Sequence, residues 1–134
     1  MPVGLVHHQL CFGCGQTNLF GLQMEVEPAD GGGVAGRFFV KQDHQGRPGL
    51  AHPGMLATAL EETMSLALEA EGVSADLESL DLRIESAVPL GTFVHVSASV
   101  GEADGGALEV TAEARLRGAG ERWVATARAR FVRA

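Results

Sequence analysis

The apolar residues of this chain follow two different periods. Between about residues 53 and 71 they run almost without interruption, and most of them are Leu, Met or Ala, which favour a helix. His52 stands where a helix N-cap belongs, Pro53 occupies the first helical position, and Gly72 follows the last turn. Because this helix is apolar on nearly every face, the pattern predicts that it is buried.

On both sides of the helix, apolar and polar residues alternate, which is typical of strands. The alternation predicts six strands, over residues 22–27, 34–41, 79–85, 94–100, 108–116 and 123–131. Glycine-rich turns separate several of them, at 30–33, 104–106 and 118–120. In the last strand we expect one set of residues to face inward: Trp123, Ala125, Ala127, Ala129 and Phe131.

The order of elements is therefore two strands, one helix and four strands. A buried helix needs a covering surface, and an antiparallel sheet is the available one. The pattern predicts a single α+β domain over residues 1–134, in which a curved sheet of about six strands wraps around one long central helix. An irregular lead-in, over residues 1–18, precedes the first strand.

Composition narrows the class of protein. The chain has 134 residues, of which 46% are hydrophobic and 20% charged, and its formal net charge is -7. The negative charge argues against nucleic acid or an anionic membrane as a partner. There is neither an apolar run long enough to span a membrane nor a pattern typical of a signal peptide. We therefore expect a cytoplasmic protein.

Two adjacent carboxylates stand in the middle of the apolar helix. Glu61 and Glu62 have no Lys or Arg within three or four residues, and none occurs between Arg47 and Arg83. A buried carboxylate without a partner is costly, so such a residue is a candidate for chemistry. Glu62 lies about 100° around the helix from Glu61, and we expect it to be an ordinary polar residue.

Cys11 and Cys14 form one Cys-x-x-Cys pair, with His7 and His8 shortly before it. A zinc site is conceivable, but this spacing supplies half of one, and no second cysteine pair follows. A thioredoxin-like redox motif would need a helix that starts at the pair, whereas glycines surround it here. We expect a glycine-rich turn with two small buried thiols, without a metal ion or a functional disulfide.

Three blocks of the sequence resemble the PaaI-like group of hotdog-fold acyl-CoA thioesterases. Cys-Phe-Gly-Cys-Gly-Gln-Thr-Asn at 11–18, followed by Gly-Leu at 21–22, resembles the lead-in of that group. His-Gln-Gly-Arg-Pro-Gly-Leu-Ala-His-Pro-Gly at 44–54 resembles its loop, and Leu-Glu-Glu-Thr-Met at 60–64 resembles its helix motif. The resemblance implies a hotdog fold, hydrolysis of an acyl-CoA thioester to free acid and CoA, and no cofactor apart from the CoA of the substrate.

The resemblance also implies roles for particular residues. The acid nine residues after His52 is Glu61, which would be the general base or nucleophile, and Ser65 would help to hold the water or the carboxylate. In this group the backbone N–H after the histidine polarises the carbonyl, but Pro53 has none. We expect that role to move to a free N–H on Gly54. His52 itself is either a helix cap or loop anchor, or a further catalytic residue. The residues expected to contact substrate are His44, Gln45, Gly46 and Pro53.

Other functions remain open. Because Pro53 lacks the usual donor, a hotdog module that binds acyl-CoA without hydrolysing it is the alternative. A hotdog hydratase would pair an Asp with a His five residues later, but Asp43 is followed five residues on by Pro48. A lone hotdog sheet would leave an open edge. We therefore expect a homodimer, or a dimer of dimers, with each site built from two chains.

Overall fold

The computed structural model describes residues 4–102, 105–117 and 120–134. Its elements are β1 (Glu25–Pro28), β2 (Val34–Phe39), the short 3-10 helix η1 (Gln42–His44), α1 (Pro53–Ala70), β3 (Ala75–Ile84), β4 (Phe93–Val100), β5 (Ala107–Leu116) and β6 (Arg122–Arg133). The predicted order of strands and helix is confirmed. Residues 1–3 of the expected lead-in, Asp104 of one expected turn and residues 118–119 of another lie outside the described residues.

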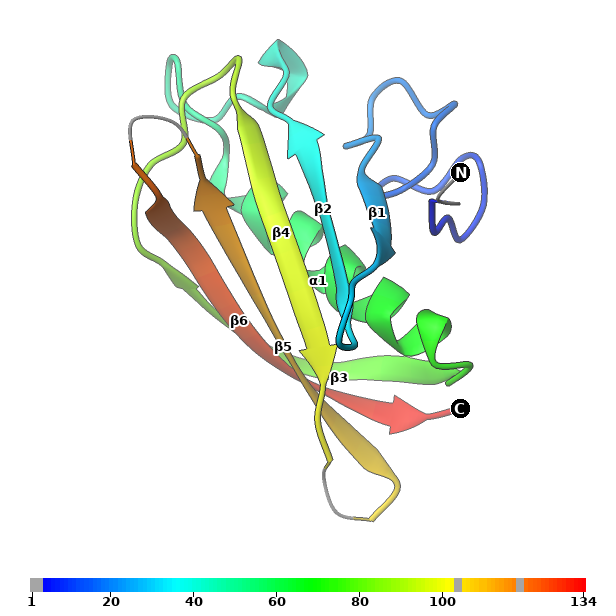
Figure 1. The fold of residues 1–134 in the computed structure, drawn as a ribbon. Helices are drawn as coiled ribbons and strands as arrows, with labels where there is room; N and C mark the ends of the chain where they lie inside the picture. The colour runs from blue at the N-terminus through cyan, green and yellow to red at the C-terminus, as the bar shows by residue number, and fades with distance from the viewer. Residues whose placement is uncertain (1–3, 103–104, 118–119) are drawn as a thin grey trace.

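In the part of the chain that the structure describes, six strands form one antiparallel sheet in the order β1-β2-β4-β5-β6-β3. The sheet curves around α1, which lies in its concave face (Figure 1). β3 follows α1 in the sequence but pairs with β6 at the far edge, so the chain crosses the whole sheet there. This arrangement is the hotdog fold that the sequence predicted.

The core lies between α1 and the concave face of the sheet. Leu60 and Met64 of α1 are fully buried, as is Phe38 of β2. Small side chains on β5 and β6, such as Ala114 and Ala125, let the helix lie close to the strands. α1 begins after His52 and ends at Ala70, as predicted, and Gly72 takes a positive φ of 74° just beyond the end.

The prediction for Trp123 is wrong. The register between β5 and β6 shifts after Ala114 pairs with Ala125, so that Arg115 pairs with Trp123 and Val124 is an extra residue. Such a bulge reverses the alternation of side chains. Trp123 is therefore 49% exposed, and the guanidinium of Arg115 lies 5.3 Å from its ring centre.

The first strand is shorter than the alternation predicted. Leu22 and Met24 are buried as expected, but Gln23 between them has a φ of 49°. This left-handed backbone interrupts the extended conformation, so the ladder with β2 starts only at Glu25. No helix within the described ranges is both long enough and apolar enough to cross a membrane.

Candidate functional site

The lead-in segment folds back along the first strand and comes to rest against α1. Backbone hydrogen bonds join Leu22 to Phe12 at 2.8 Å and Met24 to Gly13 at 3.0 Å. They hold the turn between the two cysteines over the middle of the helix. A side chain at Gly13 would overlap that of Glu62, so this close approach needs a glycine.

Glu62 is the buried member of the carboxylate pair. Only 6% of the residue is exposed, and its Oε2 lies 2.8 Å from His7 Nδ1 and 3.2 Å from Cys11 Sγ. Cys14 Sγ accepts a hydrogen bond of 3.1 Å from the backbone N–H of His7. The expectation that Glu62 is an ordinary polar helix residue is therefore wrong, because the lead-in covers it.

Cys14 is fully buried beside this carboxylate. Burial, and next the hydrogen bond with Glu62, raise the pKa of the Cys14 thiol far above its usual range. This environment favours the neutral thiol of Cys14 over the thiolate.

Glu61 has a different environment from its neighbour. It is partly buried, and within the described residues its carboxylate forms neither a hydrogen bond nor an ion pair. Burial raises the pKa of Glu61, the charge of Glu62 raises it further, and His7 opposes the shift. A carboxylate with a raised pKa and free oxygens suits a general base.

Ser65 shares a helix face with Glu61, but its hydroxyl contacts another residue. Its Oγ lies 3.2 Å from His7 Nε2, and the same nitrogen lies 3.0 Å from Glu69 Oε2. The residue proposed to assist Glu61 is therefore engaged by the lead-in histidine. A hollow of about 500 Å³ opens beside His7 and Ser65 at the end of α1.

The start of α1 differs from the expectation in one respect. The N–H of Gly54 donates a 2.8 Å hydrogen bond to His52 Nδ1, so this N–H is capped and not free. The N–H of Met55 bonds to the carbonyl oxygen of His52, also at 2.8 Å. With Pro53 lacking an N–H, a ligand at this helix start must displace the His52 side chain to reach a donor.

The loop before α1 is supported from inside by His44. This residue is 1% exposed, its Nδ1 accepts the Lys41 N–H at 3.1 Å, and its Nε2 donates to the Gly21 carbonyl at 3.2 Å. Burial is the main cause that lowers its pKa, so the ring is neutral. The side chain that was expected to contact substrate is thus enclosed within the protein.

The other expected substrate contacts lie at the surface of the same loop. Gln45 is exposed, although its Oε1 accepts the N–H of Gly49 at 2.6 Å. Gly46 and Pro53 are exposed on either side of His52, and a Cβ at Gly46 would lie 2.9 Å from His52 Cα. All three are exposed, two in the loop before α1 and one at the first residue of the helix.

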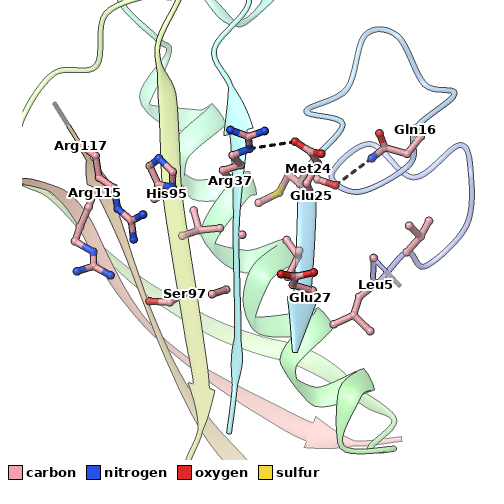
Figure 2. Close-up of a pocket in the computed structure, with 16 residues that line it drawn as sticks. Leu5, Gln16, Met24, Glu25, Glu27, Arg37, His95, Ser97, Arg115 and Arg117 are labelled. Carbon is pink, nitrogen blue, oxygen red and sulfur yellow. Dashed lines mark hydrogen bonds and ion pairs between the residues drawn. The ribbon is translucent and has the colours of Figure 1, made fainter. Parts of the chain in front are cut away.

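A larger hollow, of about 670 Å³, lies on the convex face of the sheet. Figure 2 shows Arg37, His95 and Arg115 lining it, with Glu25 joined to Arg37 by an ion pair of 3.3 Å and α1 behind the strands. Burial, and then arginines 117, 37 and 115, lower the pKa of His95. Because the sheet separates this hollow from α1, a ligand there is out of reach of Glu61.

The helix start and Glu61 are far apart within one chain. Glu61 is eight positions after Pro53, and at 1.5 Å per residue that is about 12 Å along the axis. A carbonyl oxygen held at the helix start is therefore too distant for a base at Glu61 of the same chain. The two groups can act on one substrate only if another chain supplies one of them.

Neither a protein-family model nor a curated protein sequence matches this chain. Solved structures do. A thioesterase superfamily protein is 21% identical with a TM-score of 0.84, and the match covers 92% of this chain and 60% of that one. A mutant of the phenylacetic acid degradation protein PaaI from Thermus thermophilus is 21% identical with a TM-score of 0.74, over 84% of this chain and 95% of that one.

A hypothetical thioesterase from Streptococcus pneumoniae, solved with coenzyme A, is 16% identical with a TM-score of 0.74, over 82% of this chain and 87% of that one. The structural likeness to thioesterase superfamily proteins that the motifs indicated is thus confirmed. The chain has the hotdog fold, in common with these thioesterase superfamily structures.

Proposed function

We propose that the protein hydrolyses acyl-CoA thioesters to a free acid and CoA. The observation that carries the proposal is Glu61, a partly buried carboxylate with a raised pKa on the central helix of a hotdog fold, whose oxygens bond to none of the described residues. The thioesterases among the structures of similar fold, one of them solved with coenzyme A, support the reaction and the substrate class.

In the proposed reaction, Glu61 takes a proton from water while the water oxygen attacks the thioester carbonyl. The tetrahedral intermediate then collapses, the carbon–sulfur bond breaks, and CoA leaves as a thiolate that is protonated. Direct attack by Glu61 as a nucleophile would reach the same products through an anhydride. Both routes need a donor for the negative charge that develops on the carbonyl oxygen.

The donor that we propose is the N–H of Gly54, aided by the positive end of the helix dipole. It lies about 10 Å along the axis from Glu61 of the same chain, so the helix start of one protomer would face Glu61 of its partner. When the substrate binds, the 2.8 Å hydrogen bond from this N–H to His52 Nδ1 would break, and the N–H would donate to the carbonyl oxygen instead. A homodimer is thus a part of the proposed function.

The test compares Glu61→Gln with Glu71→Gln, using a panel of acyl-CoA substrates and detection of the free thiol. Glu71 is an exposed carboxylate at the end of the same helix, so it is a matched control. Loss of a general base typically slows turnover about 10²- to 10⁴-fold, and we expect that loss for Glu61→Gln alone. Equal rates in wild type and Glu61→Gln would contradict the proposal.

A hotdog module that binds acyl-CoA without turnover is the second candidate. It is favoured by the helix start, where Pro53 has no N–H and the N–H of Gly54 is already bonded to His52. This function predicts that CoA thioesters bind to wild type and to Glu61→Gln with similar affinity. It also predicts that hydrolysis stays at the background rate in both.

A further inference from the structure

We propose that His7, Cys11, Cys14 and Glu62 bind one zinc ion, which fastens the lead-in segment to α1. These four residues, which we name the lead-in cluster, each offer one ligand atom, and the four atoms lie within 4.8 Å of one another. The cluster joins two parts of the chain that are about 50 residues apart in sequence. The proposal reverses the expectation that the two cysteines bind no metal.

The spacing of the ligand atoms is close to that of a zinc site. Zinc–ligand distances of about 2.0–2.3 Å in a tetrahedron place the ligand atoms roughly 3.3–3.8 Å apart. His7 Nδ1 lies 3.6 Å from Cys14 Sγ and 3.8 Å from Cys11 Sγ. The Glu62 oxygen lies closer, 2.8 Å from His7 Nδ1 and 3.2 Å from Cys11 Sγ, and a small rotation of its long side chain would open these distances.

The chemical types of the four ligand atoms favour one kind of metal ion. Two thiolates and an imidazole suit zinc, whereas magnesium and calcium prefer oxygen ligands throughout. Four protein ligands fill a tetrahedral shell, which is typical of structural zinc, since catalytic zinc keeps one position for water. We therefore assign the ion a structural role.

The surroundings of His7 provide the support that a metal-bound histidine normally has. Its Nδ1 faces the lead-in cluster, and its Nε2 lies 3.0 Å from Glu69 Oε2 and 3.2 Å from Ser65 Oγ. Histidine ligands commonly donate the second ring N–H to a carboxylate, which fixes the ring. The backbone N–H of His7 likewise donates to Cys14 Sγ.

A metal ion also resolves a mismatch of hydrogen-bond donors at His7. Each ring nitrogen has a carboxylate oxygen within 3.0 Å, from Glu62 on one side and Glu69 on the other. A neutral imidazole carries a single N–H and can donate to only one of them. A proton between Nδ1 and Glu62, or a cation in its place, would satisfy both atoms, and the two nearby thiols favour a metal ion.

Zinc in the lead-in cluster would leave the charge near Glu61 unchanged. Two thiolates and one carboxylate around a divalent ion sum to -1, which equals two thiols, a neutral imidazole and an ionised Glu62. The ion would therefore act by holding parts of the chain in place, not by changing the local charge. It would hold the turn at Cys11 and Cys14 against the helix face next to Glu61, and the exposed side of His7 gives the ion a path of entry.

The test is elemental analysis of untagged protein, purified without added metal and washed with a chelator. We expect about one zinc per chain in wild type, and less than about one tenth of that in His7→Ala, Cys11→Ser and Glu62→Gln. His8→Ala and Glu61→Gln are the matched controls, because each removes a sequence neighbour of a ligand, and both should keep the ion. Glu69→Gln should weaken zinc binding about tenfold, at the low end of outer-shell effects.

A second measurement uses wild-type protein alone, so that it does not depend on the folding of any variant. Cobalt(II) added to protein from which prolonged chelation has removed the zinc, as checked by elemental analysis, should produce the intense visible bands of tetrahedral cobalt and a thiolate charge-transfer band, at one equivalent per chain. Zinc should abolish both. Absence of zinc together with absence of these bands would overturn the proposal, as would full zinc content in a Cys11→Ser/Cys14→Ser double variant.

Discussion

Two neighbouring residues of α1 have carboxylates that differ in burial and in contacts because they point in different directions. Glu62 is covered by the lead-in and contacts His7 and Cys11, whereas Glu61 is partly buried and its oxygens are free within the described chain. They differ by about 100° around the helix axis, which is enough to place one under the lead-in and leave the other beside it. We therefore assign chemistry to Glu61 and metal binding to Glu62.

The raised pKa of Glu61 predicts a pH-dependent effect on stability. Since burial and the charge of Glu62 raise the folded-state pKa above 4.5, ionisation of Glu61 disfavours the folded state. The free energy of unfolding of wild type should therefore fall as the pH rises from 4.5 through the raised pKa, because Glu61 ionises over that range. Glu61→Gln has no such ionisation and should not show this fall. Thermal melting should show Glu61→Gln gaining relative to wild type over that window.

The exposed control Glu71→Gln should show no such gain. A melting difference for Glu61→Gln that is independent of pH would mean that its carboxylate is as well solvated in the folded state as in the unfolded one.

At the scale of an element, the start of α1 combines two roles that conflict. His52 caps the helix by accepting the Gly54 N–H, and Pro53 fixes the backbone of the first turn. The same N–H is the donor that the proposed reaction needs. Helix stability and oxyanion binding therefore compete for one hydrogen bond.

Removal of the cap should destabilise the protein measurably. His52→Ala leaves the Gly54 N–H without its partner, and loss of an N-cap typically costs about 1 kcal/mol. For a chain of this size we expect the melting temperature to fall by about 3 to 5 °C. His52→Asn, which keeps an N-cap acceptor, should melt near wild type, and an equal loss in both variants would show that the cap contributes nothing.

At the scale of the whole molecule, the sheet leaves β1 and β3 at its edges (Figure 1). β3 is the longer of the two, and it exposes Leu77 and Ile84 by 43% and 40%. A long edge strand with exposed apolar residues is a surface that proteins normally cover. Pairing of β3 with its copy would extend the sheet through a homodimer.

Light scattering at micromolar concentration should therefore give a homodimer, or a dimer of dimers, and a monomer would contradict this. A complementation experiment then tests the shared site. Glu61→Gln and Gly54→Pro should each be nearly inactive, the second because loss of one oxyanion donor costs about 10²- to 10³-fold.

If each site takes the helix start from one chain and Glu61 from the other, a heterodimer of the two variants keeps one intact site. Random mixing should then restore about a quarter of the wild-type rate. No recovery, in mixtures shown to contain heterodimers, would place both groups of a site in one chain.

The sequence by itself determined the elements and their order, because these depend on local geometry. The run of apolar residues defines α1, His52 and Gly72 mark its ends, and alternation marks the strands. A helix without a polar face must be covered, so the wrapped sheet followed as well. It also singled out Glu61 and Glu62, because no cation stands near them in the helix, and the resemblance chose Glu61 of the two.

Only the tertiary structure decided which groups meet. Periodicity predicts the direction in which a side chain points but not the residues that it contacts. The sequence therefore did not predict that the lead-in covers Glu62 or that His52 accepts the Gly54 N–H. One extra residue in β6 likewise turned Trp123 outward, which alternation cannot foresee. Half of the proposed metal site is visible in the sequence at Cys11 and Cys14. The other half depends on the path by which the chain brings His7 and the cysteine turn back to the helix.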